Sequence, residues 1–239
     1  MKKLFTALVA LVLSLSVSAQ FYIYCSNGYV LEVDSISLVK PDNQINNHEY
    51  VDLGLPSGLK WATCNVGANA PEEYGDYFAW GEVEPKTTYD WSTYKYGTSY
   101  DQLTKYCNDS SYGKDGFTDN KTVLDPEDDA ATVNWDGAWR MPTSAEQDEL
   151  REKCTWTWTT QNGVNGYIVT GPNGNSIFLP AAGFVGGGAL TAGSSGNYWS
   201  SSLLADYPYR AYCAVFGSGS VVWGSNNRIC GLAVRPVFK

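Results

Sequence analysis

Hydrophobic and polar positions along the chain alternate in short runs that predict strands rather than long helices. Apolar runs of a few residues recur between clusters of Gly, Asn, Pro and Asp, a spacing typical of β-rich domains with many turns. The clearest runs lie in the C-terminal third, at 167–169, 177–179, 211–216, 221–223 and 232–237. No long amphipathic helix and no heptad repeat interrupts them. The pattern therefore predicts short antiparallel strands joined by ordered loops.

Two segments are predicted to form short helices. The first is 145–153, because Thr143 and Glu146 have the spacing of a capping box, in which each residue satisfies a free backbone amide of the other. The second starts near Asp125, where Pro126 suits the first helical turn and the acidic residues that follow favour the helix dipole.

The N-terminus has the pattern of a secretory signal peptide. Lys2 and Lys3 precede an apolar stretch at 4–15, and the small residues Val17-Ser18-Ala19 follow it. The apolar stretch is shorter than the ~20 residues that a bilayer span needs. We expect cleavage after Ala19, export to the periplasm, outer surface or medium, and no transmembrane segment afterwards. A retained membrane anchor is the alternative.

The next segment predicts a small separate unit. Apolar runs at 21–24 and 29–31 flank Ser26-Asn27-Gly28, and Asn-Gly between β-formers is a strong hairpin signal. Residues 36–39 offer a third strand, and the polar stretch 41–48 is typical of a linker. The predicted organisation is a signal peptide (1–19), a hairpin unit with linker (20–48) and one large domain (49–239).

Charge excludes one class of partner. The chain has 16 basic and 25 acidic residues, a net charge of −9, and loss of Lys2 and Lys3 with the signal peptide would make it −11. Such a chain repels nucleic acid, so we expect no nucleic-acid partner. The 17 tyrosines and 9 tryptophans suit either a loop-rich core or a binding face, because their rings bury apolar area while a polar tip stays wet.

Candidate catalytic groups lack the neighbours they need. His48, the single histidine, falls in the predicted linker, and no Gly-x-Ser-x-Gly elbow surrounds the serine run at 200–202. No C-x-x-C pair occurs, and no cysteine has an obvious cationic neighbour. An oxidising compartment permits disulfides, with fifteen possible pairings of Cys25, Cys64, Cys107, Cys154, Cys213 and Cys230. We expect a protein that is not an enzyme and binds no cofactor.

The acidic run Asp125, Glu127, Asp128 and Asp129 has the hard oxygen donors that calcium prefers. It lacks the alternating acids and central glycine of an EF-hand loop. The preferred interpretation is a solvated helix N-terminus, and no metal site is predicted.

Six motifs in fixed order resemble a known family. They are 50–67 (YVDLGLPSGLKWATCNVG), 74–82 (YGDYFAWGE), 139–143 (WRMPT), 178–183 (FLPAAG), 198–202 (YWSSS) and 234–237 (VRPV). Together they are similar to the Fibrobacter succinogenes major paralogous domain, common in exported proteins of Bacteroidota-type bacteria. The resemblance implies an α+β, C-type-lectin-like fold over 49–239, with a small twisted antiparallel sheet, one or two short helices and long ordered loops.

Three more specific classes of protein with that fold can be compared with this sequence. Glu84-Pro85-Lys86 and Asn134-Trp135-Asp136 do not match the motifs of calcium-dependent lectins. Cys213 and Cys230 lie too far apart in sequence for the copper-binding pair of formylglycine-generating enzymes. Variable proteins of diversity-generating retroelements fit better, because adenine mutagenesis of their C-terminal segment cannot yield Lys, Glu, Gln, Met or Trp. Residues 203–233 contain only Trp223 from that set, although a loop-rich β segment of small residues would look similar.

The leading hypothesis is an exported or cell-surface module that displays residues 203–232 to an extracellular protein or glycan. Within 211–216, period-2 alternation with the larger aromatics inward places Tyr212, Ala214 and Phe216 in the core and Cys213 and Val215 outside. The predicted ligand-binding residues are Tyr207, Tyr209, Arg210, Cys213, Val215, Val222, Ser225, Asn226, Asn227 and Arg228. Alternatives are an enzyme of the formylglycine-generating type and a structural subunit of the envelope.

Overall fold

The computed structural model describes residues 21–24, 30–33 and 43–239. Phe21–Tyr24 (β1) and Val30–Val33 (β2) pair antiparallel, with Phe21 opposite Val33, as the hairpin pattern predicts. The predicted signal peptide and the third strand at 36–39 lie outside the described residues. Residues 43–239 form a compact unit of their own, which holds the remaining elements.

The first and last strands of this unit lie in one sheet. Gln44–Ile45 (β3), His48–Asp52 (β4), Lys60–Ala62 (β5) and Val237–Phe238 (β15) are ordered β15-β5-β4-β3. Asn46 and Asn47 make the turn between β3 and β4 with positive φ angles of 51° and 64°, which asparagine tolerates better than most residues. The stretch 43–48, interpreted as linker from its composition, is therefore a hairpin that extends the sheet.

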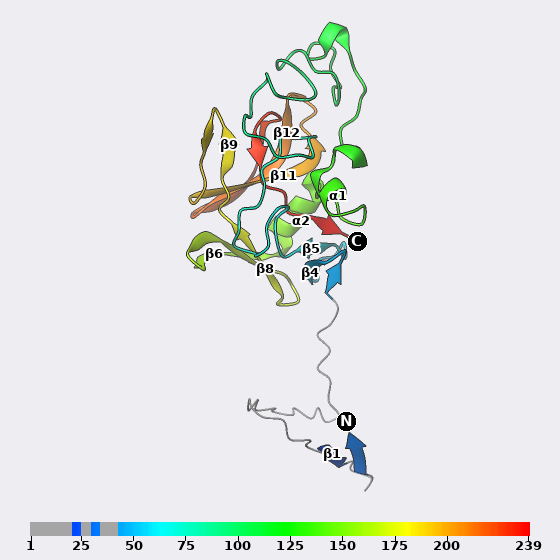
Figure 1. The fold of residues 1–239 in the computed structure, drawn as a ribbon, viewed down its shortest axis with the longest axis vertical. Helices are drawn as coiled ribbons and strands as arrows, with labels where there is room; N and C mark the ends of the chain where they lie inside the picture. Colours follow the sequence, from blue (N-terminus) through cyan, green and yellow to red (C-terminus); the bar gives the residue numbers. More distant parts are fainter. Residues whose placement is uncertain (1–20, 25–29, 34–42) are drawn as a thin grey trace. The chain divides into compact units, whose positions relative to one another are not determined.

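Three further antiparallel sheets complete the unit (Figure 1). The longest strands, Ser195–Leu203 (β11), Arg210–Gly217 (β12) and Ser220–Asn227 (β13), are ordered β11-β12-β13. Thr155–Gln161 (β6), Val164–Thr170 (β7) and Ser176–Pro180 (β8) form a second sheet. The third contains Phe184–Gly186 (β9), Ala189–Leu190 (β10) and Gly231–Leu232 (β14).

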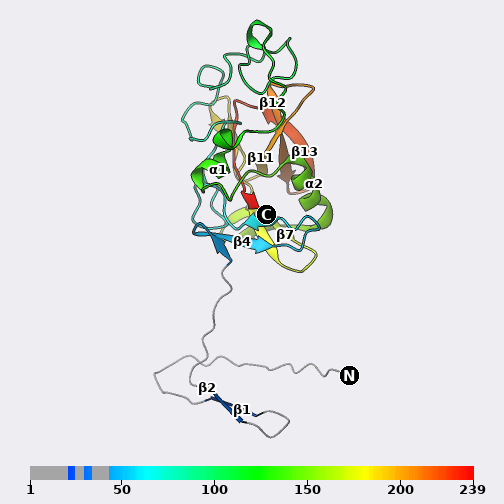
Figure 2. The same ribbon diagram turned by 90° about the vertical axis from the view of Figure 1, so that its right-hand side faces the viewer.

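The helices are short, and Figure 2 shows α1 and α2 beside the β11-β12-β13 sheet. Ser144–Lys153 (α2) carries the predicted capping box, with both reciprocal hydrogen bonds between Thr143 and Glu146. The second predicted helix consists of a 3₁₀ turn, Pro126–Asp128 (η2), and Ala130–Asn134 (α1); one further 3₁₀ turn is Lys114–Gly116 (η1). None of the helices in the described part of the chain is long and apolar enough to cross a membrane. The fold class is therefore antiparallel β with few helices, as predicted in general terms.

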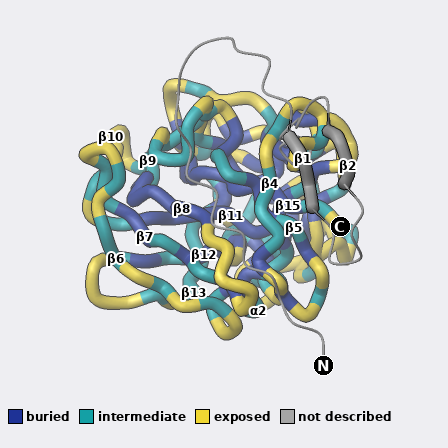
Figure 3. Tube along the Cα trace, turned by 90° about the horizontal axis from the view of Figure 1, so that it is seen from below, coloured by how far each residue is buried: buried dark blue, intermediate teal, exposed yellow. Residues whose placement is uncertain are grey.

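Strand β12 separates the two halves of the hydrophobic core, visible as the buried interior in Figure 3. Ala211 and Cys213 pack into one cluster with Trp80, Trp139 and Trp199. Ala214 and Phe216 pack into the other, with Trp61, Tyr167 and Leu179. Four residues from the six motifs, Trp139, Leu179, Trp199 and Val234, are buried in this core.

The predicted alternation along β12 is wrong for two residues. Cys213 is fully buried, and Tyr212 is 36% exposed. The prediction assumed that one face of the strand is exposed to solvent. This central strand is covered on both faces, and therefore burial does not follow a period of two. Tyr212 escapes burial because it stands near the start of the strand, beyond Ala214 and Phe216 on the same face.

Candidate ligand-binding surface

The structure spreads the ten predicted ligand-binding residues over three environments. Two are exposed (Tyr207 and Val222), two are buried (Cys213 and Arg228) and six are half-buried (Tyr209, Arg210, Val215, Ser225, Asn226 and Asn227). Val215, which pairs with Val222, follows Arg210 by five residues in β12. The two residues are therefore roughly 17 Å apart along the strand. The set therefore does not form one face, and residues 203–232 are not exposed as a whole.

Tyr207 and Tyr209 instead meet two tyrosines from a distant loop. The ring of Tyr209 lies 5.8 Å from that of Tyr100, 5.6 Å from that of Tyr112 and 6.0 Å from that of Tyr207, measured between centroids. We call these four residues the tyrosine cluster. Tyr100 is 55% exposed and Tyr207 49% exposed, so the cluster presents ring surface to solvent. Such rings supply large contact areas at a low cost in conformational entropy.

A polar hollow of about 610 Å³ adjoins the tyrosine cluster. It is lined by Asn108, Asp109, Ser110, Thr118, Asn120, Ala205 and Asp206. Asp206 directly precedes Tyr207 in the chain. On the other side, the backbone N–H of Tyr112 donates to the carbonyl of Asp109, a lining residue of the hollow, at 3.1 Å. The same two segments therefore carry the hollow and the tyrosine cluster.

Two side chains fix the loops around the hollow. The amide of Asn108 donates to the Ala205 carbonyl at 3.0 Å, while its Oδ1 is buried and has no hydrogen-bond partner in the part of the chain that the structure describes. The carboxylate of Asp109 accepts from the backbone N–H of Ser111 at 2.9 Å and from its hydroxyl at 2.8 Å. Hydrogen bonds of this kind hold a loop in a defined turn.

Arg228, predicted at the surface, is a buried anchor for the same loops. Its Nε donates to the Tyr94 hydroxyl, and Nη2 donates to the Lys105 carbonyl. Nη1 donates to the carbonyls of Tyr106 and Pro208, at 3.1 and 3.0 Å. Because Pro208 lies between Tyr207 and Tyr209, this guanidinium joins both segments that carry the tyrosine cluster.

Aromatic rings explain how Arg228 tolerates burial. The guanidinium lies 5.0 Å from the centroid of the Trp80 ring and 5.3 Å from that of Tyr94. Ring faces attract cations, and backbone carbonyls accept hydrogen bonds from the N–H groups. The positive charge of Arg228 is therefore stabilised although the side chain is buried away from water. The sequence-based prediction did not detect this environment, because its parts come from four separate segments.

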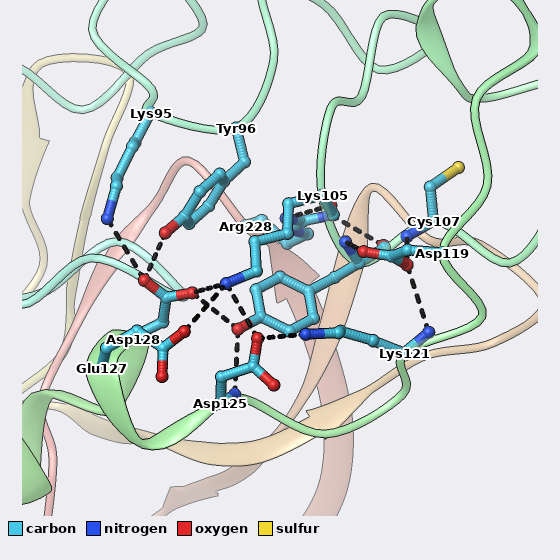
Figure 4. A network of polar contacts seen from close by, with 11 residues as sticks. Lys95, Tyr96, Lys105, Cys107, Asp119, Lys121, Asp125, Glu127, Asp128 and Arg228 are labelled. Carbon is cyan, nitrogen blue, oxygen red and sulfur yellow. Dashed lines mark hydrogen bonds and ion pairs between the residues drawn. The ribbon is translucent and has the colours of Figure 1, made fainter.

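The acidic run is the centre of an ion-pair network (Figure 4). Asp128, only 1% exposed, accepts hydrogen bonds from the hydroxyls of Tyr96 and Tyr106 and from Lys105 and Lys95. Burial opposes ionisation of Asp128, but the hydrogen bonds from Lys105 and the two tyrosines outweigh it and lower the pKa to about 2. The carboxylate is thus charged and paired inside the protein.

The ammonium group of Lys105 lies among the carboxylates of the acidic run. Carboxylate oxygens of Asp125, Glu127 and Asp128 lie within 4.8 Å of one another. The ammonium of Lys105 lies 2.8, 3.7 and 2.5 Å from these three carboxylates, and Lys121 pairs with Asp125 at 2.5 Å. This network ties the 95–121 loops to η2 and stabilises the loops that carry Tyr100 and Tyr112.

The groups considered for catalysis have structural partners. His48 stacks on Trp135 with 3.6 Å between ring centroids, and burial lowers its pKa. Burial raises the pKa of the Cys213 thiol to about 12, which disfavours the reactive thiolate. The Ser200 hydroxyl donates to the Tyr212 carbonyl and so fixes the backbone of β11 against β12.

Tyr100 and Tyr112 are functional candidates that the sequence analysis missed. Each follows small polar residues, Thr98-Ser99 and Ser110-Ser111, in a loop with few aliphatic residues. Tyrosine among serine, glycine and asparagine is a composition typical of binding loops. That signal was present in the sequence, but the contact with Tyr209 depends on the tertiary fold.

Comparison of the chain with protein-family models, curated proteins and solved structures finds no match.

Proposed function

We propose that the protein is an exported or cell-surface ligand-binding module of C-type-lectin-like fold, a member of the Fibrobacter succinogenes major paralogous domain family. The observation that carries this proposal is the tyrosine cluster with its adjoining hollow, held on loops that buried polar contacts have already ordered. Exposed tyrosine rings on ordered loops, with Ser and Asn beside them, are typical of binding surfaces. Export is supported by the signal-peptide pattern of residues 1–19.

The family proposal is supported by where its motif residues lie. Trp61, Trp80, Trp139, Trp199 and Arg235 come from five of the six motifs, and all are buried. A conserved framework with variable loops would need these residues inside. The loops between residues 95 and 121 carry little regular structure, are ordered by side-chain contacts and lie at the end of the unit opposite its C-terminus (Figure 2).

Diversification of the C-terminal segment, if it occurs, would act on only some of its positions. Tyr207, Tyr209 and Val222 reach the surface and can change without emptying the core. Cys213 and Arg228 are buried and belong to the framework. We propose that variation in this family is concentrated at the first group and is rare at the second, which sequences of close homologues would test.

The binding function is tested with the full protein on an array that carries both extracellular proteins and glycans. The double variant Tyr207→Ala/Tyr209→Ala removes half of the tyrosine cluster, and Tyr212→Ala is the matched control, an exposed tyrosine outside it. We expect at least one array ligand whose affinity falls tenfold or more in the double variant and is unchanged in the control. No retained ligand, or equal affinity in wild type and double variant, would contradict the proposal.

A further inference from the structure

We infer that the tyrosine cluster and the adjoining hollow bind a neutral carbohydrate directly, with no metal ion between protein and sugar. This inference rests on the proposed binding function and names the chemical class of the ligand. It is argued from the ring geometry, from the groups that line the hollow and from the way the loops are held.

The rings of the tyrosine cluster suit the C–H faces of sugar rings. Tyr100 and Tyr207 meet Tyr209 at interplanar angles of 73° and 69°, and Tyr112 meets it at 41°. Aromatic faces carry partial negative charge and attract the weakly positive C–H groups of an apolar sugar face. Faces in several orientations fit a bent chain of saturated rings better than they fit one flat aromatic ligand.

The groups that line the hollow match the hydroxyls of the same ligand. Asn108, Ser110, Thr118 and Asn120 are neutral and can donate as well as accept, while Asp109 and Asp206 are strong acceptors. Sugar hydroxyls also both donate and accept. The hydroxyls of Ser110 and Thr118 and the amide of Asn120 are therefore the lining groups that we expect to pair with the hydroxyls of the sugar.

Charge decides between carbohydrate classes. None of the residues that line the hollow is a lysine or arginine, and the chain has a net charge of −9. Sulfated, phosphorylated or uronic-acid glycans would be repelled by this surface. A basic peptide would be attracted by Asp109 and Asp206 and is therefore a comparison probe in the experiment.

The loops are held in place before any ligand arrives. The carboxylate of Asp119 accepts from the backbone N–H groups of Tyr106, Cys107 and Lys121, at 2.7, 3.0 and 3.1 Å. Arg228 and the Asn108–Ala205 hydrogen bond connect these loops to the segment that carries Tyr207 and Tyr209. Because these contacts order the site in advance, binding loses less entropy, which favours a ligand made of many weak contacts.

The experiment measures binding of the full protein to purified polymers by affinity electrophoresis and calorimetry. Neutral glucans, mannans, xylans and galactans are the main probes; heparin, polygalacturonate and an arginine- and lysine-rich peptide are the comparison probes. We expect binding to at least one neutral polymer that persists in EDTA. Its affinity should fall tenfold or more in Tyr207→Ala/Tyr209→Ala, and about fivefold in Thr118→Val, which removes one hydroxyl and keeps the side-chain shape. The control Tyr212→Ala, outside the tyrosine cluster, should retain binding.

The inference is overturned if no neutral polymer binds, if EDTA abolishes binding, or if Tyr212→Ala weakens binding as much as the double variant does. Binding confined to heparin, polygalacturonate or the basic peptide overturns it too. A protein ligand on the mixed array that depends on Tyr207 and Tyr209 would leave the proposed binding function standing while the carbohydrate inference fails. Thermal unfolding of each variant confirms that the loss is not caused by unfolding.

Discussion

Arg228 and Arg235 are both fully buried, and in the described part of the chain neither forms an ion pair with a carboxylate, yet they organise different regions. Arg235 donates to Asn65 Oδ1 at 2.8 Å and to the carbonyls of Ala62, Thr63 and Phe178 at 3.0, 2.6 and 3.0 Å. Its partners belong to strands and strand ends of the core. Arg228 instead joins loops that end at the solvent-exposed tyrosine cluster.

The difference shows how one kind of interaction serves two purposes. A guanidinium has five donors in a rigid fork, so it can satisfy several carbonyls that have no secondary-structure partner. Around Arg235 those carbonyls lie deep in the framework. Around Arg228 they lie in long loops next to an ion-pair network and an open hollow. In the second region the same chemistry orders a surface for binding.

The largest effect is expected from Arg235→Met. Methionine fills part of the volume but leaves the acceptors of Asn65, Ala62, Thr63 and Phe178 unpaired in the core. At ~1–3 kcal/mol for each buried unpaired group, the free energy of unfolding should fall by about 4 kcal/mol or more. Urea unfolding followed by tryptophan fluorescence measures it. A loss below about 1 kcal/mol would show that Arg235 does not hold the framework.

A smaller loss of about 3 kcal/mol is expected from Arg228→Met, because water can reach loop carbonyls more easily than core carbonyls. The sharper test is local. Amide hydrogen exchange should accelerate in residues 94–106 and 203–210, while β6, β7 and β8 keep their protection. Uniform acceleration across all strands would mean that Arg228 acts as general framework, like Arg235.

The paired carboxylate of Asp128 predicts a pH dependence of about 2 kcal/mol. Its folded pKa of about 2 lies below its ordinary unfolded value of ~3.9, so this stability is complete above about pH 4 and is lost as the pH falls towards 2. Asp128→Asn should lower stability at pH 6 and flatten the curve below pH 4. Wild type and variant are compared by urea midpoints across this range. Parallel curves for the two proteins would contradict the assignment.

The smallest effects are expected at exposed positions of the β12–β13 hairpin. Val222→Ala and Tyr212→Ala should each change the free energy of unfolding by only ~0.5 kcal/mol. Trp199→Ala, in the same sheet but fully buried, serves as the reference and should cost ~3–5 kcal/mol. Denaturant midpoints for the three variants provide the comparison. If Val222→Ala costs as much as Trp199→Ala, β13 belongs to the core and not to the surface.

Local patterns in the sequence determined the elements whose stability is local. The capping box of Thr143 and Glu146 placed the start of α2, because both of its hydrogen bonds form within one turn. Short apolar runs indicated β7, β8, β12 and β13. They missed β11, the longest strand, and the run at 232–237 contains parts of two short strands, β14 and β15, which belong to different sheets. Composition left the tryptophans open between core and binding face, and the structure places Trp139 and Trp199 in the core, where burial of such rings is favourable.

The tertiary structure alone decided which faces are buried and which distant residues meet. The alternation of β12 failed because sheet order and two-sided packing depend on contacts with segments far away in sequence. Arg228 became an anchor because carbonyls and rings from four segments surround it, and the acidic run became a paired network because Lys105 reaches it across a loop. The tyrosine cluster likewise exists only where residues 100 and 112 fold against residues 207 and 209. Long-range proximity of this kind leaves no periodic signal in a single sequence.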